Sequence, residues 1–204
     1  EYAVSQKIPC VLVNSYSDKL PSVLSDNRKG AYLAGRYLIE HGHKTVALLA
    51  GVQSYLSNQE RTAGFLQAFQ EEGLSIPPEL NLETGSWLYD AAEKVCLNFF
   101  NTYTGEMPTA LFAFNDRLAT GAINAICKTG RTVPDDVSVI GYDNLGYYNI
   151  ISPRITTVET HIEAISESTV MHMIWQLNNG SCLPVKVLTP VEVISGETVR
   201  SLLC

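Results

Sequence analysis

The chain has 204 residues, 46% of them hydrophobic and 17% charged, and its 14 Lys and Arg against 21 Asp and Glu give a net charge of −7. This composition is typical of a globular protein, and a chain of this length buries roughly 70% of the surface that its unfolded form exposes. The acidic balance, without any cluster of basic side chains, argues against a free-standing nucleic-acid-binding domain, because phosphate contacts need Lys and Arg.

The sequence carries no signal for a membrane or for export. The most apolar uncharged stretch, 46–55, is far shorter than the roughly 20 residues of a membrane helix, and residues 1–5 lack the basic and apolar regions of a signal peptide. The five cysteines have no Cys-x-x-Cys spacing, so neither a disulfide framework nor a zinc site is indicated. We therefore expect a cytoplasmic protein with buried, reduced thiols, which are Cys10, Cys96, Cys127, Cys182 and Cys204.

Short apolar runs alternate with helical patterns along most of the chain. Strands buried on both faces are predicted at 10–13, 46–50, 110–114 and 137–141. Helices are predicted at 27–41, 58–72, 90–101 and 115–129, and glycines at 42, 73 and 130 lie where three of them should end. This alternation is typical of βαβ crossovers and predicts an α/β fold with a doubly wound parallel sheet.

The last part of the chain breaks this pattern. A short strand is predicted at 155–158, a long helix at 161–178, and extended segments at 185–195, split by Pro190. This change indicates that the chain returns to another lobe.

Motifs for nucleotide binding and nucleophilic catalysis are missing. No G-x-G-x-x-G, no P-loop and no nucleophile elbow occurs. His41-Gly42-His43 could ligate a metal, but a turn that ends a helix, with a solvated histidine pair, explains the same residues. We therefore predict no catalytic residue, no cofactor and no metal site.

Polar side chains follow the predicted strands at equivalent places. In a doubly wound sheet, ligands bind at the carboxyl ends of the strands, where loops and helix N-termini converge. The residues found there include Asn14, Ser57, Arg61, Trp87, Asn115 and Asp143. Asp and Asn bond hydroxyl groups, Arg spans two oxygens, and Trp offers a flat apolar face to C–H groups. The set therefore predicts a pocket for a polyhydroxylated ligand such as a sugar.

Each of these residues also has a purely structural interpretation. Asn115 and Ser57 could cap helices, Trp87 could belong to the core, and Arg61 could form a surface ion pair. Asn14 and Asp143 could be turn residues. Taken together at the strand ends, however, they favour a binding site.

Five motifs carry a family resemblance. They are G-H-K-T-V-A-L-L-A-G at 42–51, E-R-T-A-G-F at 60–65, P-T-A at 108–110 leading to Asn115-Asp116, V-P-D-D-V-S-V-I-G-Y-D at 133–143 and I-T-T-V at 155–158. In order and spacing they resemble the effector-binding core of the LacI/GalR family of bacterial transcription regulators, over residues 8–200.

The resemblance implies a periplasmic-binding-protein-like fold of type I, with two α/β lobes and a small effector, usually a sugar or nucleobase, in the cleft. By motif, the effector would be contacted by Ser57, Arg61, Trp87, Asn115 and Asp143. Asp26 matches an acid that reaches the effector in some members, although it could equally cap the helix that starts at 27. Asn14 stands where many members carry Asp, so the recognised hydroxyl pattern would differ there.

The resemblance also implies how the chain divides. Residues 26–160 and 189–204 would form the C-terminal lobe, while 1–25 and 161–188 would be a remnant of the N-terminal lobe. The DNA-binding head and the first units of that lobe would be missing, so we expect a fragment. Helix 161–178 would then expose an apolar stripe and cause non-native association or domain exchange.

The expected function is that of an effector-binding and dimerisation domain in a transcription regulator of the repressor type, whose homodimer binds operator DNA only through the missing head. The expected effector is a small molecule, most simply a carbohydrate. Two other classes stay open at this point. An exported sugar receptor of a transport system shares the fold, and an enzyme on the same scaffold would need an acid–base pair that the sequence does not identify.

Overall fold

The computed structural model describes residues 2–6, 8–146, 153–180 and 183–203. The chain divides into two compact units, one formed by Glu1–Asn27 with Thr160–Val191 and the other by Arg28–Glu159 with Glu192–Cys204. We call these unit 1 and unit 2. No helix in the described ranges is long and apolar enough to cross a membrane.

Unit 2 is built on a six-stranded sheet in the order β4-β3-β5-β6-β7-β9. The strands are β3 (Val46–Ala50), β4 (Asn81–Glu83), β5 (Ala110–Ala113), β6 (Ser138–Asp143), β7 (Thr156–Glu159) and β9 (Glu192–Ile194). All neighbours pair in parallel except β7 and β9, which are antiparallel. The predicted parallel α/β fold is thus confirmed, with one antiparallel edge strand added.

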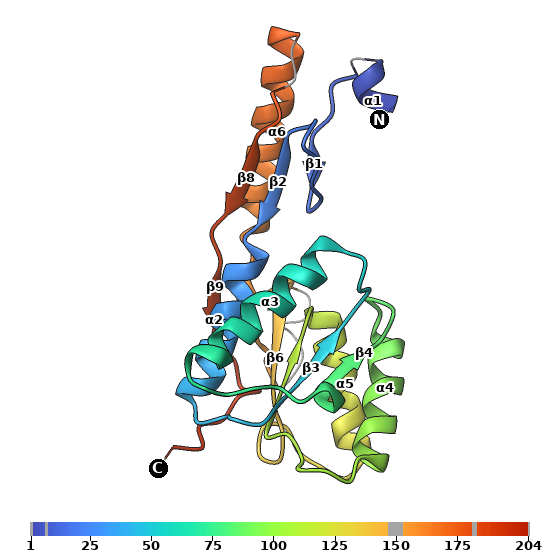
Figure 1. The fold of residues 1–204 in the computed structure, drawn as a ribbon, viewed down its shortest axis with the longest axis vertical. Helices are drawn as coiled ribbons and strands as arrows, with labels where there is room; N and C mark the ends of the chain where they lie inside the picture. Colours follow the sequence, from blue (N-terminus) through green and yellow to red (C-terminus); the bar gives the residue numbers. More distant parts are fainter. Residues whose placement is uncertain (1, 7, 147–152, 181–182, 204) are drawn as a thin grey trace. The chain divides into compact units, whose positions relative to one another are not determined.

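The helices of unit 2 cover both faces of this sheet. They are α2 (Asn27–Glu40), α3 (Leu56–Glu71), α4 (Tyr89–Thr102) and α5 (Asp116–Lys128), and a 3-10 turn spans Pro78–Leu80. The chain runs outward from β3 to β4 and then crosses back past β3 to β5. Because such crossovers are right-handed, α3 lies on one face, whereas α4 and α5 lie on the other (Figure 1). The direction in which successive strands are added to the sheet therefore reverses between β3 and β5.

Aromatic stacking and close backbone contact hold α3 in place. The rings of Phe65 and Phe112 stack with centroids 4.8 Å apart, so that α3 is packed directly on β5. On its other side, α3 touches α2 at Gly64, where a Cβ atom would lie 2.0 Å from the Arg28 carbonyl oxygen. A side chain at Gly64 would push α3 away from α2, so glycine sets the position of the helix that carries Arg61.

Unit 1 contains a small parallel sheet, in the order β1-β2-β8, and a long helix. The strands are β1 (Leu12–Val13), β2 (Ser22–Ser25) and β8 (Lys186–Thr189), and the helices are α1 (Tyr2–Ser5) and α6 (Ile162–Asn179). The Gln176 side chain ties the segment before β1 to α6, since it accepts from the Cys10 amide at 3.1 Å and donates to the Cys10 carbonyl at 3.0 Å. This pair of bonds satisfies a buried side-chain amide.

Three details of the sequence prediction need correction. The strand predicted at 10–13 is only two residues long, because it lies at the edge of a three-stranded sheet. The sequence analysis missed β2, which is short and begins and ends with Ser. The thiols are not all buried, since Cys127 is exposed and Cys10 half-buried, while Cys96 is buried. Cys182 and Cys204 lie outside the described residues.

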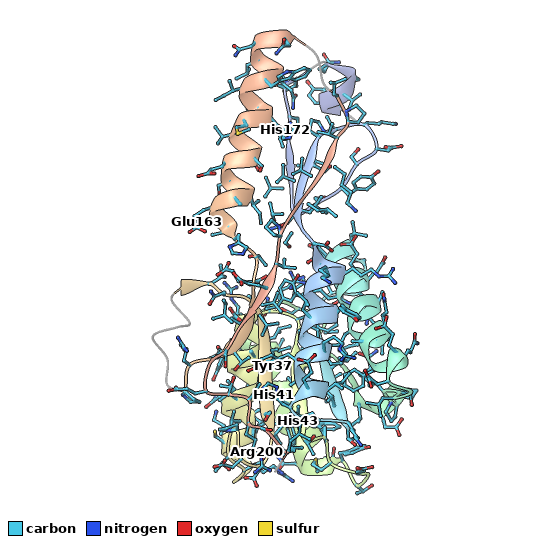
Figure 2. The ribbon with its side chains drawn as sticks, turned by 90° about the vertical axis from the view of Figure 1, so that its left-hand side faces the viewer. Tyr37, His41, His43, Glu163, His172 and Arg200 are labelled. Atoms are coloured by element: carbon cyan, nitrogen blue, oxygen red, sulfur yellow. The ribbon has the colours of Figure 1, made fainter. Side chains whose placement is uncertain are left out.

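The two histidines after α2 have separate structural roles. His43 is completely buried, with Nδ1 3.0 Å from Thr109 Oγ1 and Nε2 3.0 Å from the Arg200 carbonyl oxygen (Figure 2). Burial lowers the pKa of His43, so the neutral ring is favoured. The His41 ring stacks on Tyr37 at 4.1 Å. The prediction of a solvated pair was therefore wrong for His43, although Gly42 ends the helix as predicted.

An apolar stripe of α6 faces solvent. Its exposed side chains are Ile162, Val170, Met171, Ile174, Trp175 and Leu177. Within unit 1, a cavity of about 230 Å³ is lined by Pro21, Met171, His172, Trp175, Gln176, Leu183 and Val185. Contiguous apolar surface of this kind is usually covered by another protein surface.

We therefore expect the 204-residue chain to self-associate at micromolar concentration. Ile174→Lys combined with Leu177→Lys should shift the protein to a monomer, because both side chains are more than half exposed on α6. Ser166→Lys combined with Asn178→Lys adds the same charge at exposed polar positions of the helix and should leave association unchanged. Sedimentation velocity measures the outcome, and a compact wild-type monomer would contradict the expectation.

Candidate functional site

The carboxyl ends of β3, β5 and β6 form the edge at which the predicted binding residues of unit 2 gather. The order of the sheet reverses between β3 and β5, and in doubly wound sheets this is where ligands bind. Asn115 follows β5 and Asp143 ends β6, while Arg61 comes from the helix that follows β3. The topology therefore brings residues distant in sequence to one edge.

Arg61 is a buried cation whose partners include a carboxylate, a backbone carbonyl and an aromatic ring. Only 7% of the residue is exposed, and Nη2 lies 3.3 Å from Oδ1 of Asp143. Nη1 donates a hydrogen bond to the Phe114 carbonyl oxygen at the end of β5. The guanidinium carbon lies 3.6 Å from the ring centroid of Tyr142. Arg61 thus joins α3 to the ends of β5 and β6, and it is not the surface ion-pair partner considered from the sequence.

Asp143 is a carboxylate that is both paired and accessible. Its side chain keeps 27% of its exposure while it faces Arg61. Burial raises the pKa of Asp143, and the adjacent guanidinium acts in the opposite direction by favouring the charged form. Its backbone has φ 106, a left-handed conformation that costs energy for a residue with a Cβ. The structure therefore holds an accessible carboxylate against a buried arginine.

Asn115 uses its two amide atoms differently. Oδ1 accepts a hydrogen bond of 2.7 Å from the Leu118 amide and caps α5, so the structural interpretation holds for this atom. Nδ2 donates to the Trp87 carbonyl oxygen at 3.5 Å. An amide carries two N–H donors, and the second can serve a ligand.

Trp87 is packed across the end of β3. A Cβ atom at Gly51 would lie 2.5 Å from its indole ring, so only glycine lets the ring approach this close. The indole is half-buried, and Tyr55 meets it edge-on with centroids 6.1 Å apart. Asn58 accepts from the Gly51 amide at 3.0 Å and fixes the turn beneath. An aromatic face is thus held rigidly beside the strand end.

The other predicted site residues lie on α3 and in unit 1. Ser57 is half-buried one helical turn before Arg61, at the i and i+4 positions of α3. Asn14 and Asp26 belong to unit 1. Asn14 is exposed with φ 50, and the Asp26 amide donates to the Thr189 carbonyl at 3.2 Å. Their role in ligand binding stays a prediction.

The sequence analysis missed the part played by Asp116. Its side chain is buried, and Oδ1 accepts 2.6 Å from the Thr157 hydroxyl while Oδ2 accepts 3.2 Å from the Leu145 amide. Burial raises the pKa of Asp116 to about 7, and the nearby Asp143 carboxylate acts in the same direction. In sequence Asp116 stands out only as the neighbour of Asn115, and only the fold shows that Thr157 faces it.

The same residues offer no metal centre. Across the described ranges, no group of three or more His, Cys, Asp or Glu side chains could hold a metal ion. The cluster of Arg61, Asp143 and the Asn115 amide is suited instead to hydrogen bonding with hydroxyl groups.

We expect Asp116 to contribute a decrease in the stability of unit 2 as pH rises from about 4 to about 7. In this interval an unfolded Asp has lost its proton while folded Asp116 retains it. Asp116→Asn removes this titration, so the decrease in unfolding free energy should shrink by a few kcal/mol, one pKa unit being about 1.4 kcal/mol. The part of this decrease in unfolding free energy that is due to Asp143 should remain, because burial raises the pKa of Asp143 as well.

Urea unfolding at both ends of the interval measures the effect. Asp90→Asn is a matched control, since Asp90 is an exposed acid in the first turn of the neighbouring helix α4. An unchanged pH profile in Asp116→Asn would show that Asp116 is ionised throughout the interval.

Comparison with known proteins agrees with this geometry. The family described as periplasmic binding protein-like domain matches residues 36–199. The probable HTH-type transcriptional repressor ExuR of Bacillus subtilis (strain 168) is 31% identical over 210 residues, and the alignment covers 98% of this chain and 60% of the relative. The chain thus spans less than two thirds of the length of that protein.

Solved structures show the same architecture. A putative transcriptional regulator LacI from Bacillus cereus subsp. cytotoxis NVH 391-98 superposes with a TM-score of 0.89 at 25% identity, over 98% of this chain and 71% of that one. The lac repressor dimer bound to operator and the anti-inducer ONPF gives 0.83 at 26% identity, over 95% and 57%. The chain therefore belongs to the periplasmic binding protein-like domain family, in the form found in LacI-family transcriptional regulators.

Proposed function

We propose that the chain is the effector-binding and dimerisation domain of a LacI-type transcriptional repressor that responds to a small polyhydroxylated ligand, most simply a carbohydrate. The observation that carries the proposal is the buried Arg61 held against the accessible Asp143 carboxylate at the switch point of the sheet. The family membership supports the regulatory part of the proposal.

The chemistry of the site supports a hydroxylated ligand. Asp143 accepts hydrogen bonds from two neighbouring hydroxyl groups, and the second N–H of Asn115 donates to a hydroxyl or ring oxygen. The indole of Trp87 packs on the C–H face of a sugar ring. Ser57 adds a hydroxyl on the same helix as Arg61. Asn14 and Asp26 contribute further polar contacts from unit 1 in this proposal.

The regulatory step follows from linkage. We assign unit 2 to the C-terminal lobe of the effector-binding domain and unit 1 to part of the N-terminal lobe. In the intact protein, a homodimer in the cytoplasm binds operator DNA through a helix-turn-helix head, as the HTH-type name of the relative indicates for that protein. An effector that binds one conformation of the dimer more tightly changes the affinity of the dimer for the operator. The coupling free energy, typically about 1–3 kcal/mol, must be the same for the effect of the effector on DNA binding and of DNA on effector binding.

The alternatives from the sequence analysis gain no support. The curated relative bears the name of a transcriptional repressor, as does the operator-bound structure, and neither name describes a transport receptor or an enzyme. No catalytic activity is proposed for this site.

Calorimetric titration of the intact protein with D-ribose, D-galactose and D-glucuronate tests the proposal. We expect one of these sugar classes to bind, and Asp143→Asn to weaken that binding by roughly 10- to 100-fold, because a charge-assisted hydrogen bond contributes about 1.5–3 kcal/mol. Arg61→Ala should also abolish the effector response. Arg36→Ala is a control, since Arg36 forms its ion pairs with Glu40 and Glu72 on the surface.

Operator binding separates loss of the site from loss of the fold. Arg61→Ala and Asp143→Ala should abolish the effector response while operator binding persists. Loss of both activities together would indicate a folding defect. Binding of the nucleobase hypoxanthine in place of every sugar would contradict the carbohydrate assignment.

A further inference from the structure

The loop after β6 is held in an unfavourable backbone conformation. Asp143 has φ 106 and Asn144 has φ 52, so two successive residues with side chains adopt positive φ. Such conformations persist only where surrounding contacts over-determine them, and they concentrate at functional sites. Because Asp143 is the acid that faces Arg61, the direction of its side chain depends on whatever stabilises this turn.

Asp116 provides that stabilisation from the N-terminus of α5. Its Oδ2 accepts from the Leu145 amide at 3.2 Å, and the Asn144 amide also hydrogen-bonds this carboxylate. Its Oδ1 accepts from the Thr157 hydroxyl on β7 at 2.6 Å. One carboxylate thus binds two successive backbone amides of the strained turn and is itself fixed by a neighbouring strand.

The sheet leaves room for this contact at Gly141 on β6. A Cβ atom at Gly141 would lie 2.3 Å from Asp116 Oδ1, so the carboxylate reaches Thr157 only because β6 carries glycine there. A second bond supports the turn from β7, where Glu159 accepts from the Asn144 side chain. The turn is therefore held by side chains from α5 and β7.

We propose that Asp116 is a positioning residue of the effector site, whose ionised carboxylate fixes the backbone at Asn144 and Leu145 so that Asp143 faces Arg61 and the ligand. One consequence of the inference rests on the proposed function: effector binding should weaken when the Asp116 carboxylate is neutralised. Its geometric part, the order of the turn, stands without a ligand.

Protonation gives the proposal a pH dependence. A protonated carboxyl group gains a donor and loses acceptor capacity and negative charge, so it holds the Thr157 hydroxyl and the two amides less strongly than the ionised form. The charged group that acts on Asp116 is Asp143 on β6, whose ion pair with Arg61 reduces its effect. Glu159 on β7 accepts from the Asn144 side chain of the same turn, and Arg117 on α5 is exposed. Burial places the pKa of Asp116 at about 7, so the turn loosens as pH falls below neutrality.

Amide hydrogen exchange of the ligand-free protein tests the geometric part. After correction for intrinsic rates, exchange at Asn144 and Leu145 in the wild type should be about tenfold faster at about pH 5.5 than at about pH 8.5. Asp116→Asn should exchange at the fast rate at both pH values, whereas the amide of Val139, buried in the same strand β6, stays protected and reports that the fold is intact.

Two further variants sharpen the result. Thr157→Val removes a hydroxyl that donates to the ionised carboxylate, so the pH midpoint of the exchange change should move upward. Asp90→Asn, the control on α4, should behave as the wild type. Equal exchange at Leu145 in Asp116→Asn and wild type would overturn the proposal, as would an unmoved midpoint in Thr157→Val.

Sugar binding tests the consequence separately. D-ribose, D-galactose and D-glucuronate are titrated against wild type and Asp116→Asn at both pH values. For any sugar that the wild type binds, we expect the dissociation constant of the variant to be about tenfold higher at about pH 8.5 and nearly independent of pH. Equal affinity would overturn the proposal. If no sugar binds the wild type, the proposed function fails, and the exchange result alone decides the role of Asp116.

Discussion

The burial of the Arg61 guanidinium is the constraint around which unit 2 is arranged. A charge that is only 7% exposed must be compensated by partners, because desolvation costs several kcal/mol per ion. Asp143 supplies the countercharge, the Phe114 carbonyl an acceptor and the Tyr142 ring a polarisable face. Since these partners belong to the ends of two neighbouring strands, satisfying the arginine also locks β5, β6 and α3 into one geometry. Binding residues built on such a framework are already oriented before a ligand arrives, which reduces the entropy lost on binding.

Small residues determine where this framework can form. Gly64 lets α3 approach α2, Gly51 lets the indole of Trp87 lie on the end of β3, and Gly141 admits the Asp116 carboxylate behind β6. Each is a place where a Cβ atom would meet another group at 2.5 Å or less. These three close contacts support the residues of the candidate site. The reversal of strand order lies between β3 and β5, and in doubly wound sheets ligands bind at the carboxyl ends of the strands at such a point.

Much of this arrangement could be predicted from the sequence, for reasons that lie in particular residues. Apolar runs such as 46–50 form β3 in full, and Gly42 ends α2 because it takes φ 87. The polar residues after the strands were identified because their positions follow from the fold class. What periodicity could not show is pairing across the sheet: Asp116 and Thr157 are 41 residues apart, and only the order β5-β6-β7 brings them together. Likewise His43 looked solvated in sequence, since its partners Thr109 and Arg200 lie far away along the chain.

The adjacent residues Asn115 and Asp116 show how one helix start can serve both structure and site. Asn115 caps α5 through its side-chain oxygen, which relieves Asp116 of that task and leaves its carboxylate to hold the turn after β6. Burial and the nearby Asp143 carboxylate disfavour the charged form of Asp116, whereas the hydrogen bonds that it accepts favour that form, and the pKa of about 7 reflects this balance. A carboxylic acid poised in this way makes the folded state less stable at neutral pH than an acid with an ordinary pKa would. Functional sites often keep features that lower stability. Here the two features are the backbone strain at Asp143 and the buried carboxylate of Asp116, and together they direct the accessible Asp143 side chain toward Arg61.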